Sequence, residues 1–343
     1  MALFVDIEKR LGNFQLQVKF ETQDQVLALL GASGCGKSMT LKCIAGIETP
    51  DRGKILLDGK VLFDSEKKIN LTPQKRNVGY LFQQYALFPN MTVWQNIACG
   101  VRDKKRVKDV LPQIIVDMHL EGLEDKKPHQ LSGGQQHRVA LARILVNEPK
   151  VLLLDEPFSA LDSHLRWELE RQLMATLRKF SGAVLFVSHD RDEVYRIADH
   201  VAVYDQGKID RMGDKWDVFQ NPVTCSAARL TGCKNIAAAE FVENTVTVPE
   251  WGLSLLTEDV VPGAKFLGVR ARKLRAAERP GPNVYPFTIV EEIQGAFSDI
   301  LMIQLEAGKE PLRWEMTKEA RQVLSAGPQL VYFPDDAVLT LTE

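Results

Sequence analysis

An eight-residue segment near the start of this 343-residue chain has the residue types and spacing that bind phosphate. It reads Gly31-Ala32-Ser33-Gly34-Cys35-Gly36-Lys37-Ser38, between an apolar run at 26–30 and a helix-forming run that begins at Met39. Glycines let the backbone turn tightly and bring its N–H groups close to an anion, and a helix start adds partial positive charge. We therefore expect a polyphosphate-binding loop in which Lys37 reaches the β- and γ-phosphates and the Ser38 hydroxyl binds Mg²⁺. The alternative is a Gly-rich turn that matches the pattern without binding a ligand.

Polar side chains follow three further apolar runs that predict buried strands. The polar residues are Gln83, the pair Asp155 and Glu156, and His189, and the runs before them cover 78–82, 151–154 and 183–187. Because ligands bind at the carboxyl ends of strands in such sheets, we expect these side chains beside the phosphate loop. There Asp155 would support Mg²⁺, Glu156 would polarise an attacking water and His189 would contact the γ-phosphate. An acidic pair or a histidine taken alone is more often structural, so the assignment depends on the whole set.

A second Gly-rich segment opens a later helix. It reads Leu131-Ser132-Gly133-Gly134-Gln135, and a serine with two glycines at a helix start makes another anion site. One chain needs a single site for a γ-phosphate, and Lys37 already supplies it. A second chain would therefore use this segment across an interface, unless the segment is only a Gly-rich helix cap.

The composition is that of an ordinary soluble protein with about two domains. Apolar residues make up 45% and charged residues 26%, and the net charge of −2 does not suggest a general nucleic-acid binder. No apolar run approaches the length of a membrane span and the N-terminus has no signal-peptide pattern, so we expect neither element. The five cysteines form no C-x-x-C pair, which indicates a reducing cytoplasm rather than a disulfide framework.

Sequence periodicity predicts an α/β region in the first part of the chain. Alternation over residues 3–20 predicts two antiparallel strands with a turn at Gly12-Asn13. Phe14 in the second strand would either stack on a nucleotide base or belong to the core or strand edge. Residues 92–125 have helical spacing, and another helix is predicted over about 136–147.

The tail of the chain is predicted to be β-rich. Helical spacing fades near Gly232, and short alternating segments with Pro and Gly between them follow. The predicted strands cover 245–248, 266–270, 286–293, 300–305, 311–315, 330–333 and 338–342. One short helix is predicted at about 317–325, so the tail is predicted to be an all-β domain such as a small barrel.

Together these motifs resemble those of the ATP-binding-cassette (ABC) ATPases, in the family's order, over about residues 1–230. By that resemblance the motifs are the Walker A loop at Gly31 to Ser38, the Q-loop Gln83, the signature motif at Leu131 to Gln135, the Walker B Asp155, the catalytic Glu156, the D-loop at Ser159 to Asp162 and the switch His189. The resemblance implies ATP and Mg²⁺ as cofactors. Gln83 would then be both a catalytic residue and a metal ligand beside Ser38 and Asp155, and Asp162 would help to bind the nucleotide. Phe14 falls where many members have a base-stacking aromatic residue, and Met39 stands where many have Thr.

The same resemblance implies the fold. It is an α/β P-loop NTPase with a RecA-like core, an antiparallel β subdomain and a helical subdomain at about 84–148. A β-rich regulatory domain is expected at 231–343, with a barrel similar to an oligomer-binding fold, of the type called TOBE, at about 283–343.

The family also suggests partners. Its members form head-to-tail dimers that hold ATP between the Walker A loop of one chain and the signature motif of the other, and one copy of each motif predicts a homodimer. Separate transmembrane permease subunits would dock after Gln83, with a periplasmic or extracellular solute-binding protein acting indirectly. We expect the chain at the cytoplasmic face of the bacterial inner membrane, without nucleic acid. A non-transport cassette protein would tend to have paired cassettes or a long coiled coil, and a small-molecule kinase would need a phosphoryl acceptor site rather than Glu156.

Some segments resemble the molybdate and sulfate importers within that family, among them Leu11-Gly12-Asn13, 59–65 and 71–76. We therefore expect oxyanion uptake, with ferric iron, polyamine or sugar as the alternative. In some relatives the tail binds an oxyanion and holds the transporter shut. Basic residues at 270–273 would serve such an anion here, or would only protect a strand edge.

Overall fold

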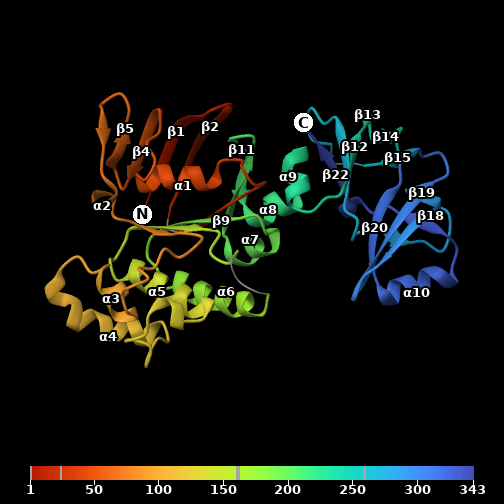
Figure 1. Cartoon of the computed structure of the whole chain (residues 1–343). Helices are drawn as coiled ribbons and strands as arrows, with labels where there is room; N and C mark the ends of the chain where they lie inside the picture. Colours follow the sequence, from red (N-terminus) through yellow and green to blue (C-terminus); the bar gives the residue numbers. More distant parts are fainter. Residues whose placement is uncertain (1, 24, 160–162, 258–259) are drawn as a thin grey trace. The chain divides into compact units, whose positions relative to one another are not determined.

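The computed structural model describes residues 2–23, 25–159, 163–257 and 260–343. They form two units, Met1–Lys215 and Trp216–Glu343 (Figure 1). The expected domain boundary after residue 230 stays a prediction. Within the described ranges, no helix combines the length and apolar content that crossing a bilayer requires.

A six-stranded sheet forms the centre of the first unit, in the order β11-β10-β3-β9-β8-β7. Its strands are β3 (Val26–Gly31), β7 (Val78–Leu81), β8 (Val151–Asp155), β9 (Ala183–Ser188), β10 (His200–Asp205) and β11 (Lys208–Asp214). All neighbours are parallel except β10 and β11. Every residue of β8 and β9 is buried, which explains their continuous apolar sequences. Because β3, β9, β8 and β7 run parallel, the polar residues predicted at their carboxyl ends lie along the same edge of this sheet.

A second, five-stranded antiparallel sheet has the order β2-β1-β4-β5-β6. Its strands are β1 (Leu3–Leu11), β2 (Phe14–Thr22), β4 (Arg52–Leu57), β5 (Lys60–Asp64) and β6 (Ile69–Asn70). Strands β1 and β2 pair from Leu3 with Thr22 to Leu11 with Phe14, so the predicted hairpin with its turn at Gly12-Asn13 is confirmed. Alternate residues of β1 and β2 face the core, as the alternation predicts.

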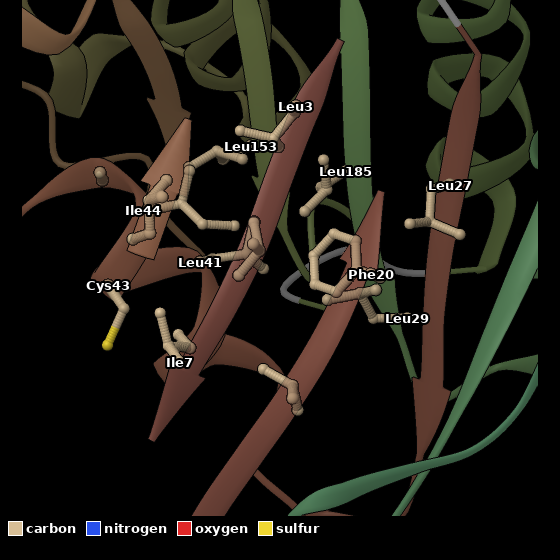
Figure 2. Close-up of a cluster of buried hydrophobic side chains, with 14 of the residues drawn as sticks. Leu3, Ile7, Phe20, Leu27, Leu29, Leu41, Cys43, Ile44, Leu153 and Leu185 are labelled. Carbon is tan, nitrogen blue, oxygen red and sulfur yellow. The ribbon is translucent and has the colours of Figure 1, made fainter. Parts of the chain in front are cut away.

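Helix α1 (Lys37–Ala45) brings the two sheets into one hydrophobic core. Figure 2 labels part of this cluster: Leu3, Ile7, Phe20, Leu27, Leu29, Leu41, Cys43, Ile44, Leu153 and Leu185. A fully buried side chain of this size contributes about 1.5–3 kcal/mol to folding. The cluster therefore fixes α1, and with it the loop from which α1 starts.

A buried arginine holds the other end of α1. Arg76, the last residue of helix α2 (Pro73–Arg76), is 0% exposed and donates to the carbonyls of Cys43 and Ile44 at 2.8 and 2.9 Å. A guanidinium suits this position because the last carbonyls of a helix lack partners and carry partial negative charge. Gly46 caps α1 with φ 80°, and a Cβ there would lie 2.5 Å from Arg76 Nε, so only glycine fits.

In the described part of the first unit, further helices follow α1 and α2 along the chain. They are α3 (Val93–Ala98), α4 (Val107–Asp117), α5 (Gly133–Leu145), α6 (Ser163–Leu177) and α7 (Arg191–Ile197), with one-turn helices η1 (Lys104–Arg106) and η2 (Pro128–Gln130). The prediction of helical structure throughout 92–125 is wrong. The chain leaves the helix near Gly100, where a Cβ would lie 2.1 Å from the Arg143 carbonyl of α5, and α4 ends before His119, which has φ 51°.

Strands dominate the second unit, which begins with helices α8 (Lys215–Gln220) and α9 (Cys225–Leu230) and includes α10 (Lys318–Ala326). Its three sheets have the orders β12-β16-β22, β13-β14-β15 and β17-β21-β18-β19-β20. In Figure 1 this unit has blue-green and blue colours. The strands are β12 (Asn235–Ala238), β13 (Glu240–Val242), β14 (Thr245–Val248), β15 (Leu253–Leu256), β16 (Phe266–Val269), β17 (Arg275–Ala276), β18 (Val284–Gln294), β19 (Ser298–Leu305), β20 (Leu312–Thr317), β21 (Leu330–Tyr332) and β22 (Val338–Leu341).

The five-stranded sheet of this unit curls into half a barrel. β18 pairs with β21 over its first residues and with β19 thereafter, and its pairing shifts register between Ile289 and Glu291. Such a bulge bends a strand and increases its twist. All seven predicted strands and the helix are present, whereas β12, β13, β15 and the two-residue β17 were not predicted.

Candidate active site

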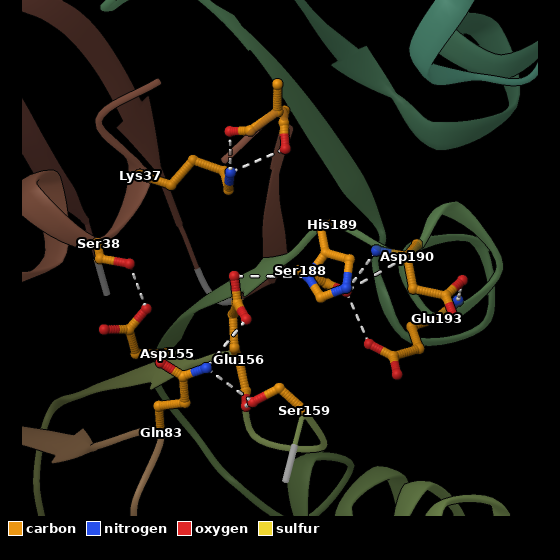
Figure 3. A network of polar contacts seen from close by, with 12 residues as sticks. Lys37, Ser38, Gln83, Asp155, Glu156, Ser159, Ser188, His189, Asp190 and Glu193 are labelled. Atoms are coloured by element: carbon orange, nitrogen blue, oxygen red, sulfur yellow. Dashed lines mark hydrogen bonds and ion pairs between the residues drawn. The ribbon is translucent and has the colours of Figure 1, made fainter. Parts of the chain in front are cut away.

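The predicted phosphate loop connects β3 to α1. Gly34 and Gly36 have φ of 82° and 103°, and a Cβ on Gly36 would lie 2.6 Å from Leu16 Cδ1. The Lys37 side chain is buried and turns back over the loop, where Nζ donates to the carbonyls of Gly31 and Ala32, both at 2.8 Å (Figure 3). The ammonium thus uses backbone oxygens of the loop as its partners.

Ser38 and Asp155 bring the start of α1 to the end of β8. The Ser38 hydroxyl donates to Asp155 Oδ1 at 2.6 Å, and the hydroxyl of Tyr80 on β7 donates to Oδ2 at 2.7 Å. Burial and the adjacent carboxylate raise the pKa of Tyr80 above its usual range, so its hydroxyl keeps its proton. Hydroxyl and carboxylate oxygens are ligands of the kind that Mg²⁺ prefers.

Glu156 lies between two of the other predicted residues. Its Oε1 is 3.5 Å from His189 Nδ1, and its Oε2 accepts from Gln83 Nε2 at 3.4 Å. The Gln83 amide also donates to Ser159 Oγ at 3.1 Å. Glu156 has φ 46°, a conformation that costs a residue with a side chain about 1–2 kcal/mol, and its N–H donates to the carbonyl of Val187 at 3.1 Å. Backbone strain of this kind concentrates at functional sites.

Hydrogen bonds of the two neighbouring residues, Ser188 and Asp190, fix the turn that carries His189. Ser188 Oγ donates to the buried Glu193 at 2.7 Å and accepts the N–H of Asp190 at 3.0 Å. Asp190 in turn caps α7 through the N–H groups of Asp192 and Glu193. Burial raises the pKa of Glu193 above its usual value. The imidazole itself is exposed, and Figure 3 shows it pointing toward Glu156 from its own strand end.

The second Gly-rich segment is separate from this cluster. Ser132 caps α5 by accepting the N–H of Gln135, and the Gln135 side chain accepts the N–H of Ser132. The predicted helix at 136–147 therefore starts three residues earlier, at Gly133. Among the described residues, no hydrogen bond or ion pair joins Ser132, Gly133, Gly134 or Gln135 to Lys37, Ser38, Asp155 or Glu156.

Three further predicted residues have different outcomes. The Phe14 ring packs against the core, with Cζ 3.2 Å from the position of a Cβ on Gly36, so it borders the loop. Base stacking by Phe14 stays a prediction. Met39 is partly buried and packs against the same core. Asp162 lies outside the described residues.

Sequence reasoning missed two polar side chains that support these loops. The sequence presents Tyr80 only as part of an apolar strand, although the hydroxyl of a tyrosine that packs against a core needs a partner. Arg143 of α5 donates to the carbonyls of Tyr85 and Ala86 at 3.1 and 2.9 Å, just after Gln83. No sequence spacing indicated that contact, because the two segments are almost 60 residues apart.

Comparisons with known proteins agree with this geometry. Residues 13–159 match the family model described as "ABC transporter". The spermidine/putrescine import ATP-binding protein PotA of Clostridioides difficile is 44% identical over 238 residues, which is 68% of this chain and 66% of that protein. The chain thus spans slightly less than two thirds of that relative. The PotA of Oleidesulfovibrio alaskensis is 37% identical, over 81% of this chain and 72% of that protein.

Other relatives extend the comparison. The sulfate/thiosulfate import ATP-binding protein CysA of Acinetobacter baylyi is 36% identical over 89% of this chain and 88% of that protein. A solved structure described as a dimeric post-hydrolysis state of the ATP-binding cassette MJ0796, bound to ADP and Pi, aligns with a TM-score of 0.53 and 25% identity. The alignment covers 63% of this chain and 99% of that one.

The fold and site define a P-loop ATPase with a β-rich C-terminal region. The chain belongs to the ATP-binding proteins of ABC transporters, the ABC transporter ATPases.

Proposed function

We propose that the chain is the ATP-hydrolysing motor subunit of an ABC importer. The observation that carries the proposal is the meeting of three groups at one edge of the central sheet: the Lys37 loop after β3, the Ser38–Asp155 pair at β8, and the Glu156–His189 pair. Together these groups supply a phosphate site, a metal site and a base for water.

The loop would hold the polyphosphate of ATP. When phosphate oxygens enter, the Lys37 ammonium exchanges its contacts with the Gly31 and Ala32 carbonyls for contacts with the anion. The N–H groups at the start of α1 add their partial positive charge. The exchange keeps a buried charge partnered throughout, so it avoids the penalty of an unpaired ammonium.

The residues around Asp155 fit a magnesium ion. Ser38 Oγ and Asp155 Oδ1 are 2.6 Å apart, and Mg²⁺ is usually bound by one or two protein oxygens together with substrate phosphates and water. When bound, the ion would neutralise charge that develops on the phosphates. Ser38 and Asp155 would hold it. Gln83 as a further ligand stays a proposal, since its amide contacts Glu156 and Ser159 in this structure.

Glu156 would accept a proton from the attacking water. His189 and Gln83 flank its two carboxylate oxygens and would orient the carboxylate and the γ-phosphate. The separate position of Ser132 to Gln135 supports a homodimer in which the partner chain completes the site. Nucleotide binding by Asp162 stays a proposal. The dimeric cassette with ADP and Pi is consistent with that arrangement. Permease subunits that cross the membrane would then be separate chains, and this chain would sit at the cytoplasmic face.

Two solute classes are supported by different observations. The PotA relatives are named for spermidine and putrescine import, and they favour a polyamine over the oxyanion expected from the sequence. The CysA relative is named for sulfate and thiosulfate import, and its match covers 89% of this chain, which includes most of the β-rich region. We place the polyamine first.

The test combines hydrolysis with uptake. Glu156→Gln should lower the rate of MgATP hydrolysis by about 10²–10⁴-fold, the usual contribution of a general base, and should accumulate an ATP-bound dimer in size-exclusion chromatography. The matched control Glu121→Gln changes an exposed carboxylate and should hydrolyse ATP normally. Lys37→Ala should weaken binding of a fluorescent ATP analogue. Full hydrolysis by Glu156→Gln would refute the assignment of the base.

Uptake identifies the solute. Cells without their own systems would express the chain with its neighbouring operon genes and receive labelled spermidine, sulfate or molybdate. Accumulation that is lost in Glu156→Gln identifies the transported solute. Hydrolysis without uptake of spermidine would exclude the polyamine proposal.

A further inference from the structure

Tyr80 lies outside the set of residues that the sequence motifs identify, yet its hydroxyl contacts the proposed metal ligand. We infer that Tyr80 is a positioning residue for Asp155: it holds one carboxylate oxygen so that the other faces Ser38 and the metal. The inference rests on the proposed role of Asp155 in binding Mg²⁺. It concerns the orientation of the carboxylate and not the identity of the ligand.

The contacts on the carboxylate are divided between its two oxygens. Ser38 Oγ donates to Oδ1 at 2.6 Å and Tyr80 Oη donates to Oδ2 at 2.7 Å. An ionised carboxylate only accepts hydrogen bonds, so each hydroxyl must use its proton here. Among the side chains that the structure describes, Tyr80 alone donates to Oδ2. Asp155 is 8% exposed, so solvent offers Oδ2 little replacement for that bond.

The Tyr80 ring is fixed independently of its hydroxyl. β7 and β8 are parallel, and Tyr80 is opposite Leu153, two residues before Asp155. The ring packs against the main core and lies 4.4 Å, between centroids, from the ring of Phe82. A phenylalanine at this position would keep those contacts and lose only the hydrogen bond. The structure therefore separates the packing of the ring from its effect on the carboxylate.

Loss of the hydroxyl would change how Asp155 presents its oxygens. The terminal torsion of an aspartate is broad, so a carboxylate without a partner on Oδ2 can rotate and turn that oxygen elsewhere. Mg²⁺ requires nearly ideal octahedral geometry, and removing a hydrogen-bond partner of a ligating group typically weakens metal binding 10–100-fold. Binding of metal-free ATP by the Lys37 loop does not depend on Asp155 and should stay unchanged.

The experiment measures metal binding directly. In a Glu156→Gln background, which keeps ATP intact, Mn²⁺ is titrated into the full-length protein with ATP, and free Mn²⁺ is followed by electron paramagnetic resonance. We expect Tyr80→Phe to raise the Mn²⁺ dissociation constant by about 10–100-fold. The affinity for a fluorescent ATP analogue in EDTA should stay within about twofold of the parent value, as expected if only a partner of the metal ligand is lost. With Glu156 intact, the Mg²⁺ concentration for half-maximal hydrolysis should rise while the rate at saturating Mg²⁺ changes much less.

Two controls separate positioning from general damage. Tyr85→Phe removes another buried hydroxyl, which donates to the Pro157 carbonyl at 3.4 Å and does not contact Asp155, and it should leave Mn²⁺ affinity unchanged. In an Asp155→Asn background, Tyr80→Phe should produce no further loss. An equal loss in Tyr85→Phe, or a further loss in the Asp155→Asn background, would overturn the inference.

The outcomes also distinguish this inference from the proposed function. A parent protein that binds no Mn²⁺ with ATP would refute the proposed metal site and the inference together. A parent that binds Mn²⁺ and a Tyr80→Phe variant that binds it equally well would refute the inference alone.

Discussion

Replacement of Arg76 by methionine should strongly destabilise the first unit, although Arg76 is not part of the active site. Arg76 is fully buried and makes four hydrogen bonds, two of them to the last turn of α1. Methionine has a similar length and no donor. The variant would leave the carbonyls of Cys43 and Ile44 without the charge that balances this end of the helix.

The magnitude follows from those contacts. Hydrogen bonds from a charged group contribute about 1.5–3 kcal/mol each, so four of them amount to roughly 6–12 kcal/mol. Burial of the charged guanidinium is itself unfavourable, and this desolvation lowers the pKa of Arg76 in the folded state. Removing the charge relieves the desolvation, which offsets several kcal/mol of the lost hydrogen bonding. We therefore expect a net loss of about 4 kcal/mol. For a domain of this size that corresponds to a fall in melting temperature of roughly 8–16 °C.

The assay is thermal denaturation of the full chain, followed by circular dichroism and without nucleotide. Lys75→Met is the matched control, because Lys75 precedes Arg76 on α2 and its side chain is exposed. Arg76→Lys should be intermediate, since an ammonium has three donors but lacks the planar fork. A melting temperature of Arg76→Met within about 3 °C of the parent would refute the reasoning, because it would correspond to a loss near 1 kcal/mol.

Two further predictions concern α5. Burial, with a smaller contribution from Arg138, lowers the pKa of His137 from 6.5 to about 4. Between pH 6.5 and 4 the unfolded chain therefore binds more protons than the folded chain. The free energy of unfolding is undiminished above pH 6.5 and should fall by about 3 kcal/mol, because of this residue, as the pH drops through that window. In urea denaturation, the loss of stability from pH 7 to pH 5 should be smaller in His137→Leu than in the parent protein. Arg143→Met should release the Tyr85 and Ala86 carbonyls, both on residues with positive φ, and speed amide exchange over 83–88 relative to the parent. Unchanged exchange there would show that Arg143 does not hold the loop.

The sequence was most informative where local chemistry decides the structure. The loop at Gly31 to Ser38, the buried strands and the polar residues at their ends follow from residue type and spacing, and the structure brings Ser38 to Asp155 and Glu156 to His189. Alternating segments with turn residues between them likewise located most strands of the second unit.

Contacts between distant segments could not be predicted in this way. Helical spacing continues through Gly100, but the close approach of α5 breaks the helix there. Arg76 has the sequence context of an exposed loop and is completely buried. Tyr80 is an ordinary strand residue until β8 places Asp155 beside it. The decisive contacts join residues more than 30 positions apart: Gly100 with Arg143, Arg76 with the end of α1, and Tyr80 with Asp155. A single sequence, considered without an alignment, contains no signal for such pairs.

The place of β3 between β9 and β10 has a consequence for the order in which the protein becomes functional during its synthesis. β3 ends at Gly31, whereas its neighbours pair with it through residues 184–188 and 200–204. A ribosome that adds 5–20 residues per second needs roughly 10–35 s to make the chain between them. During that interval the nascent chain has a phosphate loop, but the strand that leads into it has neither of its neighbours, so the complete site for ATP forms only after Tyr204 has emerged.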